Sequence, residues 1–221
     1  MAYGFLDIAS TPAVKAAQEA NGVRKLWADF KGHRAFDRFT ENEARYIAER
    51  DSLFIATVSE SGWPYVQHRG GAPGFLTVID DRTLAFPDFR GNRQYISLGN
   101  LSANDKAALI LMDYPNRRRL KIFGHIEVKA LAAVPEVAAR FAESGYGAKV
   151  ERVFLVHLEA FDWNCHQHIT PRFSEAELAP ALAPLRAHLE KLEAENKMLR
   201  ERLAALGVTS ESGAPVHDSV P

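Results

Sequence analysis

The residues from 53 to 163 contain short apolar runs that are separated by turn residues. Runs of this length, rich in β-branched and aromatic residues and bounded by Gly, Pro, Asp and Ser, are typical of β-strands. They follow one another in hairpin-like succession, so a barrel fits better than a doubly wound sheet. We therefore expect a mainly β fold with helical insertions at 93–104 and 134–145. The expected strands are LFIATVS, PYVQHRG, GFLTVID, TLAF, AALILMDY, RLKIFGHIEVKA and VFLVHLEAFDW.

The chain on either side of these strands has a different texture. Residues 1–39 are expected to form a helical arm, with Pro12 in the first turn of a helix. Thr40 and Glu43 match a capping box ahead of a short amphipathic helix. We expect a barrel domain over 40–173, an amphipathic helix over 174–207 and a disordered tail over 208–221, where the residues are small, polar and interrupted by proline.

The expected C-terminal helix carries leucine in a heptad repeat. Pro180 and Pro184 are costly inside a helix, so we expect the continuous helix to start near Pro184. The repeat is typical of a leucine zipper or coiled coil, but a helix that packs on the barrel, pairs antiparallel or binds another protein has the same stripe. One seam of the repeat is Leu178, Leu185, Leu192, Leu199 and Leu206, and the other is Leu182, Leu189, Asn196 and Leu203.

The composition argues against several classes of partner. Of the 221 residues, 47% are hydrophobic, and 27 Lys and Arg against 28 Asp and Glu leave a net charge of -1. This balance gives no overall field that would attract nucleic acid or an anionic membrane. No stretch approaches the roughly 18 consecutive apolar residues of a membrane span. Cys165 is the single cysteine, which suits a reducing compartment, so we expect a cytoplasmic protein.

Three short cationic segments begin or follow expected strands. They are QHRGG at 67–71, FRGNR at 89–93 and RRRLK at 117–121. If they meet at one rim of the barrel they form an anion pocket, because arginine donates bidentate hydrogen bonds to phosphate and glycine lets backbone amides approach. Solvated surface arginines beside turns are the alternative, and the spacing does not decide between the two.

The segment FDWNCHQHITPRF gathers residue types that bind metals. Cys165 and His166 point opposite ways on a strand, and no second ligand pair has a standard spacing, so we expect no metal site. Cys165 lacks a definable catalytic triad and fits a buried structural thiol better than a nucleophile. Trp163 fits either a core residue or a wall against a flat aromatic ligand.

The sequence from Leu53 to Arg172 resembles the FMN-binding proteins related to pyridoxamine 5′-phosphate oxidase. The segments that carry the resemblance are QHRGG, DFRGNRQY and DWNC-QHI, which are similar to an uncharacterised branch of that family. The resemblance implies a split β-barrel that forms a homodimer, with FMN at the subunit interface.

The resemblance also implies which residues hold the cofactor. Arg93 and Asn92 fall where the family has its phosphate-binding pair, and Arg119 stands where the family usually has glutamine. Trp163 matches a tryptophan that packs near the cofactor from the partner subunit. The full set of matched positions is Arg69, Gly70, Gly71, Phe75, Leu76, Phe86, Pro87, Asp88, Arg90, Asn92, Arg93, Arg119, Lys121, Trp163 and Arg172.

The function implied by this resemblance is an FMN-dependent oxidoreductase that acts on a small molecule by hydride transfer at the flavin. His68 and His168 are the candidate proton donors. The oxidase's substrate-binding Arg-x-His segment has no clear counterpart, so pyridoxamine phosphate oxidation itself is not expected. Two alternatives remain: a flavin-binding or flavin-sensing module without turnover, and a split barrel that uses haem or a deazaflavin.

Overall fold

The computed structural model describes residues 4–28, 37–142, 146–163 and 166–207. The chain divides into two compact units, Met1–Pro171 and Arg172–Pro221, which are described separately below. The expected tail at 208–221 and the expected structural thiol of Cys165 lie outside the described residues.

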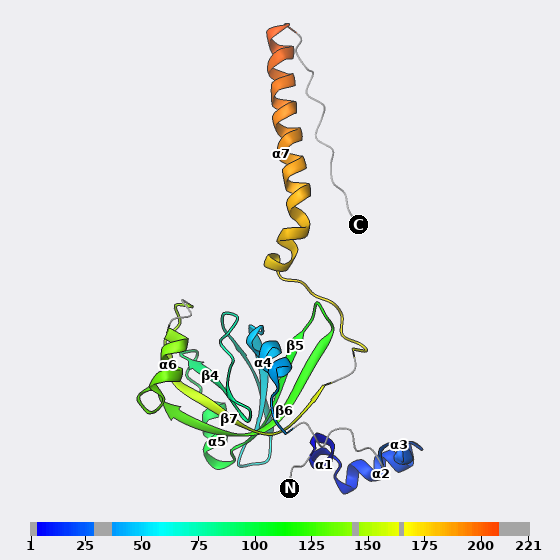
Figure 1. Ribbon diagram of the computed structural model, residues 1–221, viewed down its shortest axis with the longest axis vertical. Helices are drawn as coiled ribbons and strands as arrows, with labels where there is room; N and C mark the ends of the chain where they lie inside the picture. Colours follow the sequence, from blue (N-terminus) through cyan, green and yellow to red (C-terminus); the bar gives the residue numbers. More distant parts are fainter. Residues whose placement is uncertain (1–3, 29–36, 143–145, 164–165, 208–221) are drawn as a thin grey trace. The chain divides into compact units, whose positions relative to one another are not determined.

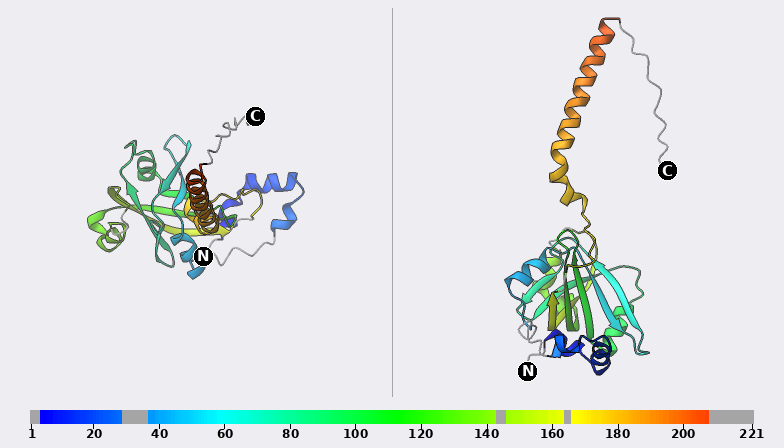
Figure 2. Two further views of the ribbon diagram at one scale, coloured as in Figure 1. Left: turned by 90° about the horizontal axis from the view of Figure 1, so that it is seen from above. Right: turned by 90° about the vertical axis from the view of Figure 1, so that its right-hand side faces the viewer.

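The first unit is built on one curved sheet of seven strands (Figure 1). Each neighbouring pair is antiparallel, in the order β2-β1-β5-β6-β7-β4-β3. The right-hand view of Figure 2 shows strands running side by side around the interior. This arrangement confirms the expected mainly β, split-barrel fold. The strands are β1 (Ser52–Val58), β2 (Pro64–Gly70), β3 (Thr77–Asp80), β4 (Thr83–Phe89), β5 (Lys106–Asp113), β6 (Arg118–Ala130) and β7 (Val150–Trp163).

Short helices surround the sheet. The two expected insertions are present as α5 and α6, and the capping box of Thr40 and Glu43 starts α4 as the sequence predicts. No described helix combines the length and apolar composition that crossing a membrane requires. The helices of this unit are α1 (Phe5–Ala9), α2 (Pro12–Ala20), α3 (Arg24–Ala28), α4 (Glu41–Ala48), α5 (Ile96–Ala103) and α6 (Pro135–Ala142), with a 3-10 turn at Leu131–Ala133.

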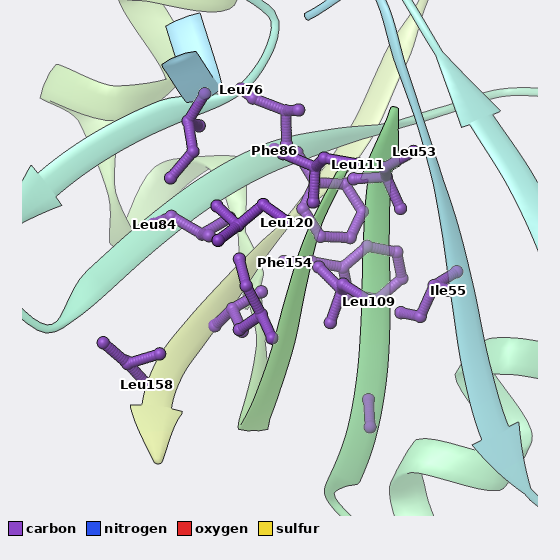
Figure 3. Packing of buried hydrophobic residues seen from close by; sticks show 14 of the residues in the cluster. Leu53, Ile55, Leu76, Leu84, Phe86, Leu109, Leu111, Leu120, Phe154 and Leu158 are labelled. Carbon is purple, nitrogen blue, oxygen red and sulfur yellow. The ribbon is translucent and has the colours of Figure 1, made fainter. Parts of the chain in front are cut away.

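The core lies inside the curve of the sheet, where alternate strand residues converge (Figure 3). On β1, for example, Leu53 and Ile55 point inward and are 1% exposed. Phe86 and Phe154 come from paired strands and lie with their ring centroids 5.1 Å apart. Burial of such side chains is the main source of stability, at about 1.5–3 kcal/mol each. The barrel unit therefore completes a core within one chain.

The edges of the sheet explain where it opens. Strand β3 pairs with β4 only as far as Ala85, so the later part of β4 has β7 on one side and no strand on the other. Pro87 fits this position because it has no amide hydrogen to donate to a neighbouring strand. Strand β2 is the edge at the opposite end of the sheet order. The gap in the barrel lies between these two edges, as the contacts of Arg69 and Asp88 described below show.

The second unit contains one long helix, α7 (Glu175–Ala205). It includes Pro180 and Pro184, so the expectation that the continuous helix begins near Pro184 is wrong. The start is set instead by a capping box. The Ser174 side chain accepts a hydrogen bond from the Glu177 amide at 3.3 Å, and Glu177 accepts one from the Ser174 amide at 2.7 Å. This cap satisfies amides that a helix start leaves free and offsets part of the cost of the two prolines.

Candidate functional site

A small polar pocket opens at the gap in the barrel. Its volume is about 160 Å³, and it lies between β2, the end of β4, and the loop that leads into α5. Among the residues expected to bind the cofactor, it brings together Arg69, Asp88, Asn92 and Arg93. The complete lining is Tyr65, Gln67, Arg69, Asp88, Phe89, Gly91, Asn92, Arg93, Gln94, Tyr95, Ile96 and Leu98.

A buried carboxylate between two arginines bridges the gap. Asp88 on β4 accepts a hydrogen bond from Arg69 on β2 at 2.5 Å and one from Arg152 on β7 at 2.8 Å. The Asp88 side chain is 7% exposed. The Nε atom of Arg69 is buried and has no hydrogen-bond partner among the described residues. A buried donor without a partner costs about 1–3 kcal/mol, which an acceptor in the pocket would recover.

A second carboxylate holds the outer part of this network. Glu151 accepts hydrogen bonds from Arg90 Nε at 2.8 Å and from the Tyr95 hydroxyl at 3.1 Å. The hydrogen bond from Arg90 is the main reason that the pKa of Glu151 lies below its ordinary value. Arg152 lies 5.0 Å from the centre of the Tyr95 ring. Arg90 is therefore paired with Glu151, which also accepts the hydrogen bond of Tyr95, a residue that lines the pocket.

The charges around the pocket favour an anion. Arg69, Arg90, Arg93 and Arg152 are opposed by Asp88 and Glu151, so four positive groups face two negative ones. Among the described residues Arg93 is exposed and has no hydrogen-bond or ion-pair partner. An unpaired guanidinium at a pocket already rich in arginine is suited to bidentate contact with a phosphate.

The backbone at the start of α5 points to the same chemistry. Tyr95 precedes the helix with a φ of 52°, and no side chain caps the helix start. Arg93 also has a positive φ, at 60°. Such conformations are costly for residues other than glycine and persist where the surrounding structure holds them. An uncapped helix start presents free amides and a partial positive charge, which favours an anion at this end of the pocket.

The helix α5 is also fastened to the strands beside the pocket. Ser97 donates a hydrogen bond to Gln67 at 2.8 Å, and Asn100 donates one to Thr57 at 3.0 Å. These contacts fix the helix start relative to β1 and β2. The helix start that borders the pocket is thus held in a fixed place against the strands.

Four of the expected residues contribute packing instead of side-chain contacts to the pocket. Leu76 and Phe86 are fully buried in the core, Phe75 is 3% exposed, and Pro87 is buried within β4. A Cβ atom at Gly71 would lie 2.8 Å from Phe75 Cβ, so this position must be glycine for Phe75 to pack. Gly70 ends β2. Any contact of this group with a ligand would come from the backbone.

Three expected residues point away from the pocket. His68 lies on β2 between Gln67 and Arg69, so strand alternation places it on the outer face, where its ring is 5.4 Å from that of Phe54. Arg119 and Lys121 alternate with buried Leu120 on β6 and face outward too. Lys121 pairs with Asp162 at 2.7 Å. The Nε atom of Arg119 is buried without a hydrogen-bond partner among the described residues.

Trp163 and His168 do not line the pocket either. Trp163 Nε1 donates a hydrogen bond to Glu43 at 2.8 Å, and its ring packs edge-on against Tyr46 at 4.6 Å. His168 is exposed and has a φ of 62°. Arg172 belongs to the second unit of the chain. Of the three cationic segments, the first two therefore contribute residues to the pocket. Arg119 and Lys121 of the third segment lie on the outer face instead.

Several residues of the site were not expected from the sequence. Tyr65 and Gln67 line the pocket, and strand alternation from Arg69 would have found them. Arg152 and Glu151 had no such signal, because only the pairing of β4 with β7 brings Arg152 beside Asp88.

Several solved structures are similar to this chain at low sequence identity. HupZ from Group A Streptococcus is 19% identical, with a TM-score of 0.47 over 61% of this chain and 99% of that one. A putative pyridoxamine 5′-phosphate oxidase from Lactobacillus delbrueckii is 20% identical, with a TM-score of 0.44 over 57% and 94%. An FMN-binding protein from Syntrophomonas wolfei is 16% identical, with a TM-score of 0.42 over 66% and 97%. No curated protein sequence matches the chain.

The family is shown by the sequence. Residues 39–164 match the family model described as pyridoxamine 5′-phosphate oxidase. The match covers more than half of the 221 residues and contains every strand of the sheet as well as the pocket. The chain belongs to the pyridoxamine 5′-phosphate oxidase family.

Proposed function

We propose that the barrel unit binds FMN, with the phosphate of the cofactor in the pocket at the start of α5. The observation that carries this proposal is the combination of an uncapped helix start with the unpaired Arg93 and the unsatisfied Nε of Arg69. These groups are hydrogen-bond donors that lack acceptors. A phosphate supplies acceptor oxygens and negative charge in one group.

Arg93, Arg69, Asp88 and Arg152 each have a defined part in this proposal. Arg93 contacts the phosphate directly, and the backbone amides at 95–97 approach it from the helix start. Arg69 is held in place by Asp88, which in turn is fixed by Arg152. Removing the Asp88 charge would free both arginines to move. Asp88 is therefore a positioning residue.

The size of the pocket implies that the ring system lies elsewhere. Pockets that enclose whole ligands of this size are about 300–1,000 Å³, whereas this one is about 160 Å³. An apolar groove of about 470 Å³ lies on the outer face of β1, β5 and β6, lined in part by Ala56, Val58, Ala108 and Phe123. A second copy of the barrel on this face would bury these residues, so we propose a homodimer.

Bound FMN would supply hydride transfer to or from a small molecule. The protein would supply binding, orientation and a proton. His68 and His168 remain the candidate proton donors. His68 has the more defined environment, because Phe54 fixes one side of its ring on the outer face that the homodimer would cover.

The purified chain tests this function directly. Mass spectrometry of the co-purified ligand is expected to give FMN, and the absorption spectrum is expected to show flavin bands that bleach with a reduced nicotinamide. Flavin bands that never bleach under any electron donor would leave a flavin-binding module without turnover. A Soret band or a deazaflavin mass would contradict FMN.

A further inference from the structure

We propose that α7 binds α7 of a second copy of this chain as a parallel, two-stranded coiled coil. The first observation is that none of the described α7 residues is buried. The heptad leucines are exposed by 37–71% of their surface. Exposed leucines that share one stripe are costly in water and mark a surface that another helix covers. The stripe consists of Leu178, Leu185, Leu192, Leu199 and Leu206 at d positions and Leu182, Leu189, Asn196 and Leu203 at a positions.

The surface of α7 has the hollow that a coiled-coil partner needs. In coiled coils, each d residue inserts into a hole formed by four residues of the facing helix. In a parallel pair the hole for Leu192 of the second copy is formed by Leu189, Leu192, Glu193 and Asn196. All four residues line one groove on α7. The groove is also lined by the charged residues Lys197, Arg200 and Glu201, so only the part at Leu189 and Leu192 has the apolar character that a leucine side chain requires.

The charges that flank the stripe fit a second copy of the same helix. In a parallel pair, each g residue faces the e residue five positions later on the other chain. Glu195 then faces Arg200, and His188 faces Glu193. The other two such contacts in the repeat pair an arginine with Ala181 or Gly207, so no like charges meet. Self-association therefore meets no electrostatic penalty at these positions.

Asn196 selects the parallel orientation. It is the one polar residue at the a and d positions between Leu178 and Leu206. In a parallel pair it faces Asn196 of the second copy, and the two amides hydrogen-bond to each other. In an antiparallel pair a positions face d positions, so Asn196 would face Leu185 or Leu192 with its amide unsatisfied. A buried amide without a hydrogen-bond partner disfavours that orientation.

This proposal goes beyond cofactor binding and does not depend on it. Coiled coils of three to four heptads are marginal alone, so dimerisation of the barrel would help by raising the local concentration of α7. The measurement is therefore made on the full chain, with flavin content recorded separately. Loss of flavin without loss of helix pairing would affect only the proposed function.

Disulfide cross-linking tests the pairing and its direction. In a Cys165→Ser background, which removes the chain's single cysteine, Leu199→Cys places a thiol at a d position. Glu201→Cys is the matched control, because it lies at the outward f position two residues away. Two d residues face each other in a parallel pair and fall within disulfide distance, whereas two f residues do not. We expect Leu199→Cys to form the covalent dimer at least about tenfold more completely than Glu201→Cys under mild oxidation.

Two results would overturn the proposal. Equal, low cross-linking of both variants would mean that the α7 stripe does not face its own copy. Preferential cross-linking in a mixture of Leu189→Cys and Leu199→Cys chains, compared with either alone, would mean that the pair is antiparallel. If the disulfide of the Leu199→Cys dimer is reduced more readily in the unfolded chain than in the folded chain, this result further supports pairing in the native state.

Discussion

The barrel unit and α7 use their leucines in opposite ways. Leu84, Leu111 and Leu120 of the barrel are fully buried, whereas Leu185, Leu199 and Leu206 of α7 are 55%, 61% and 71% exposed. The barrel is stabilised by contacts within one chain. A helix whose apolar stripe has no cover in its own unit gains little from burial. The difference sets a unit that completes its own core beside a helix whose stripe the proposed coiled coil would cover.

The test with the largest expected effect truncates one apolar side chain in each unit. Phe154→Ala removes a ring that is fully buried against Phe86, and we expect the free energy of unfolding of the barrel to fall by about 3–5 kcal/mol. Leu199→Ala, at an exposed position of α7, is expected to change the same transition by less than about 0.5 kcal/mol. Denaturant unfolding followed by near-UV circular dichroism measures both. Similar losses in the two variants would mean that α7 packs on the barrel.

The second test concerns the anion pocket. Arg93→Ala removes the unpaired guanidinium at the pocket, and we expect FMN binding to weaken by roughly a hundredfold. Arg38→Ala is the control, since Arg38 forms an exposed ion pair with Asp81 and is worth little. Titration of apoprotein with FMN, followed by flavin fluorescence, gives both dissociation constants. An unchanged value for Arg93→Ala would show that Arg93 is a solvated surface residue.

The pocket also shows what sequence could predict. DFRGNR contains Asp88, Asn92 and Arg93, which were all expected to bind the cofactor and which all line the pocket. Strand periodicity predicted the mainly β fold because apolar residues recur along each strand. Arg152 could not be expected at the site, since its place depends on the pairing of β4 with β7 over a long sequence separation. Contacts of this kind follow from topology and not from local pattern.

In α7, one local signal in the sequence predicted the wrong start of the helix. The cost of Pro180 and Pro184 suggested a late helix start, but the capping box at Ser174 and Glu177 sets the start earlier. Each proline removes one hydrogen bond from the helix, and a strong N-terminal cap offsets part of this loss. The residues that signal the cap were present in the sequence.

The third test compares the capping boxes of the two units. In the barrel, burial alone would raise the pKa of Glu43, but hydrogen bonds from Thr40, Trp163 and Asn42 bring the pKa below its ordinary value. A lowered pKa in the folded state means that ionised Glu43 stabilises the fold above about pH 4.5, and that this contribution is lost as the pH falls through the lowered pKa. We expect Glu43→Gln to destabilise the barrel by roughly 1–2 kcal/mol at neutral pH.

The pH dependence and a matched variant separate this effect from simple disruption. The stability difference between Glu43→Gln and the parent chain is expected to shrink at acidic pH, where Glu43 itself becomes protonated. Glu177 has the same place in the capping box of α7 but is exposed, so Glu177→Gln is expected to have a smaller effect on thermal unfolding. A Glu43→Gln effect that does not vary with pH would show that packing, and not charge, holds Glu43.

The smallest expected effect belongs to Asn196, because one polar residue at an a position trades stability for specificity. Asn196→Leu replaces the paired amides by apolar contact. We expect the temperature at which the α7 helix unfolds to rise, by an amount equivalent to about 1 kcal/mol of stability. The unfolding transition of the barrel is expected to stay unchanged. Without the polar layer, assemblies larger than a dimer become accessible, and light scattering is expected to show them. Ala194→Leu is the control. Residue 194 lies at the outward f position, so this substitution adds a leucine side chain that does not contact the a and d positions. If Asn196→Leu lowers stability and leaves a single dimeric species, then Asn196 contacts the body of the protein and α7 is not a coiled coil.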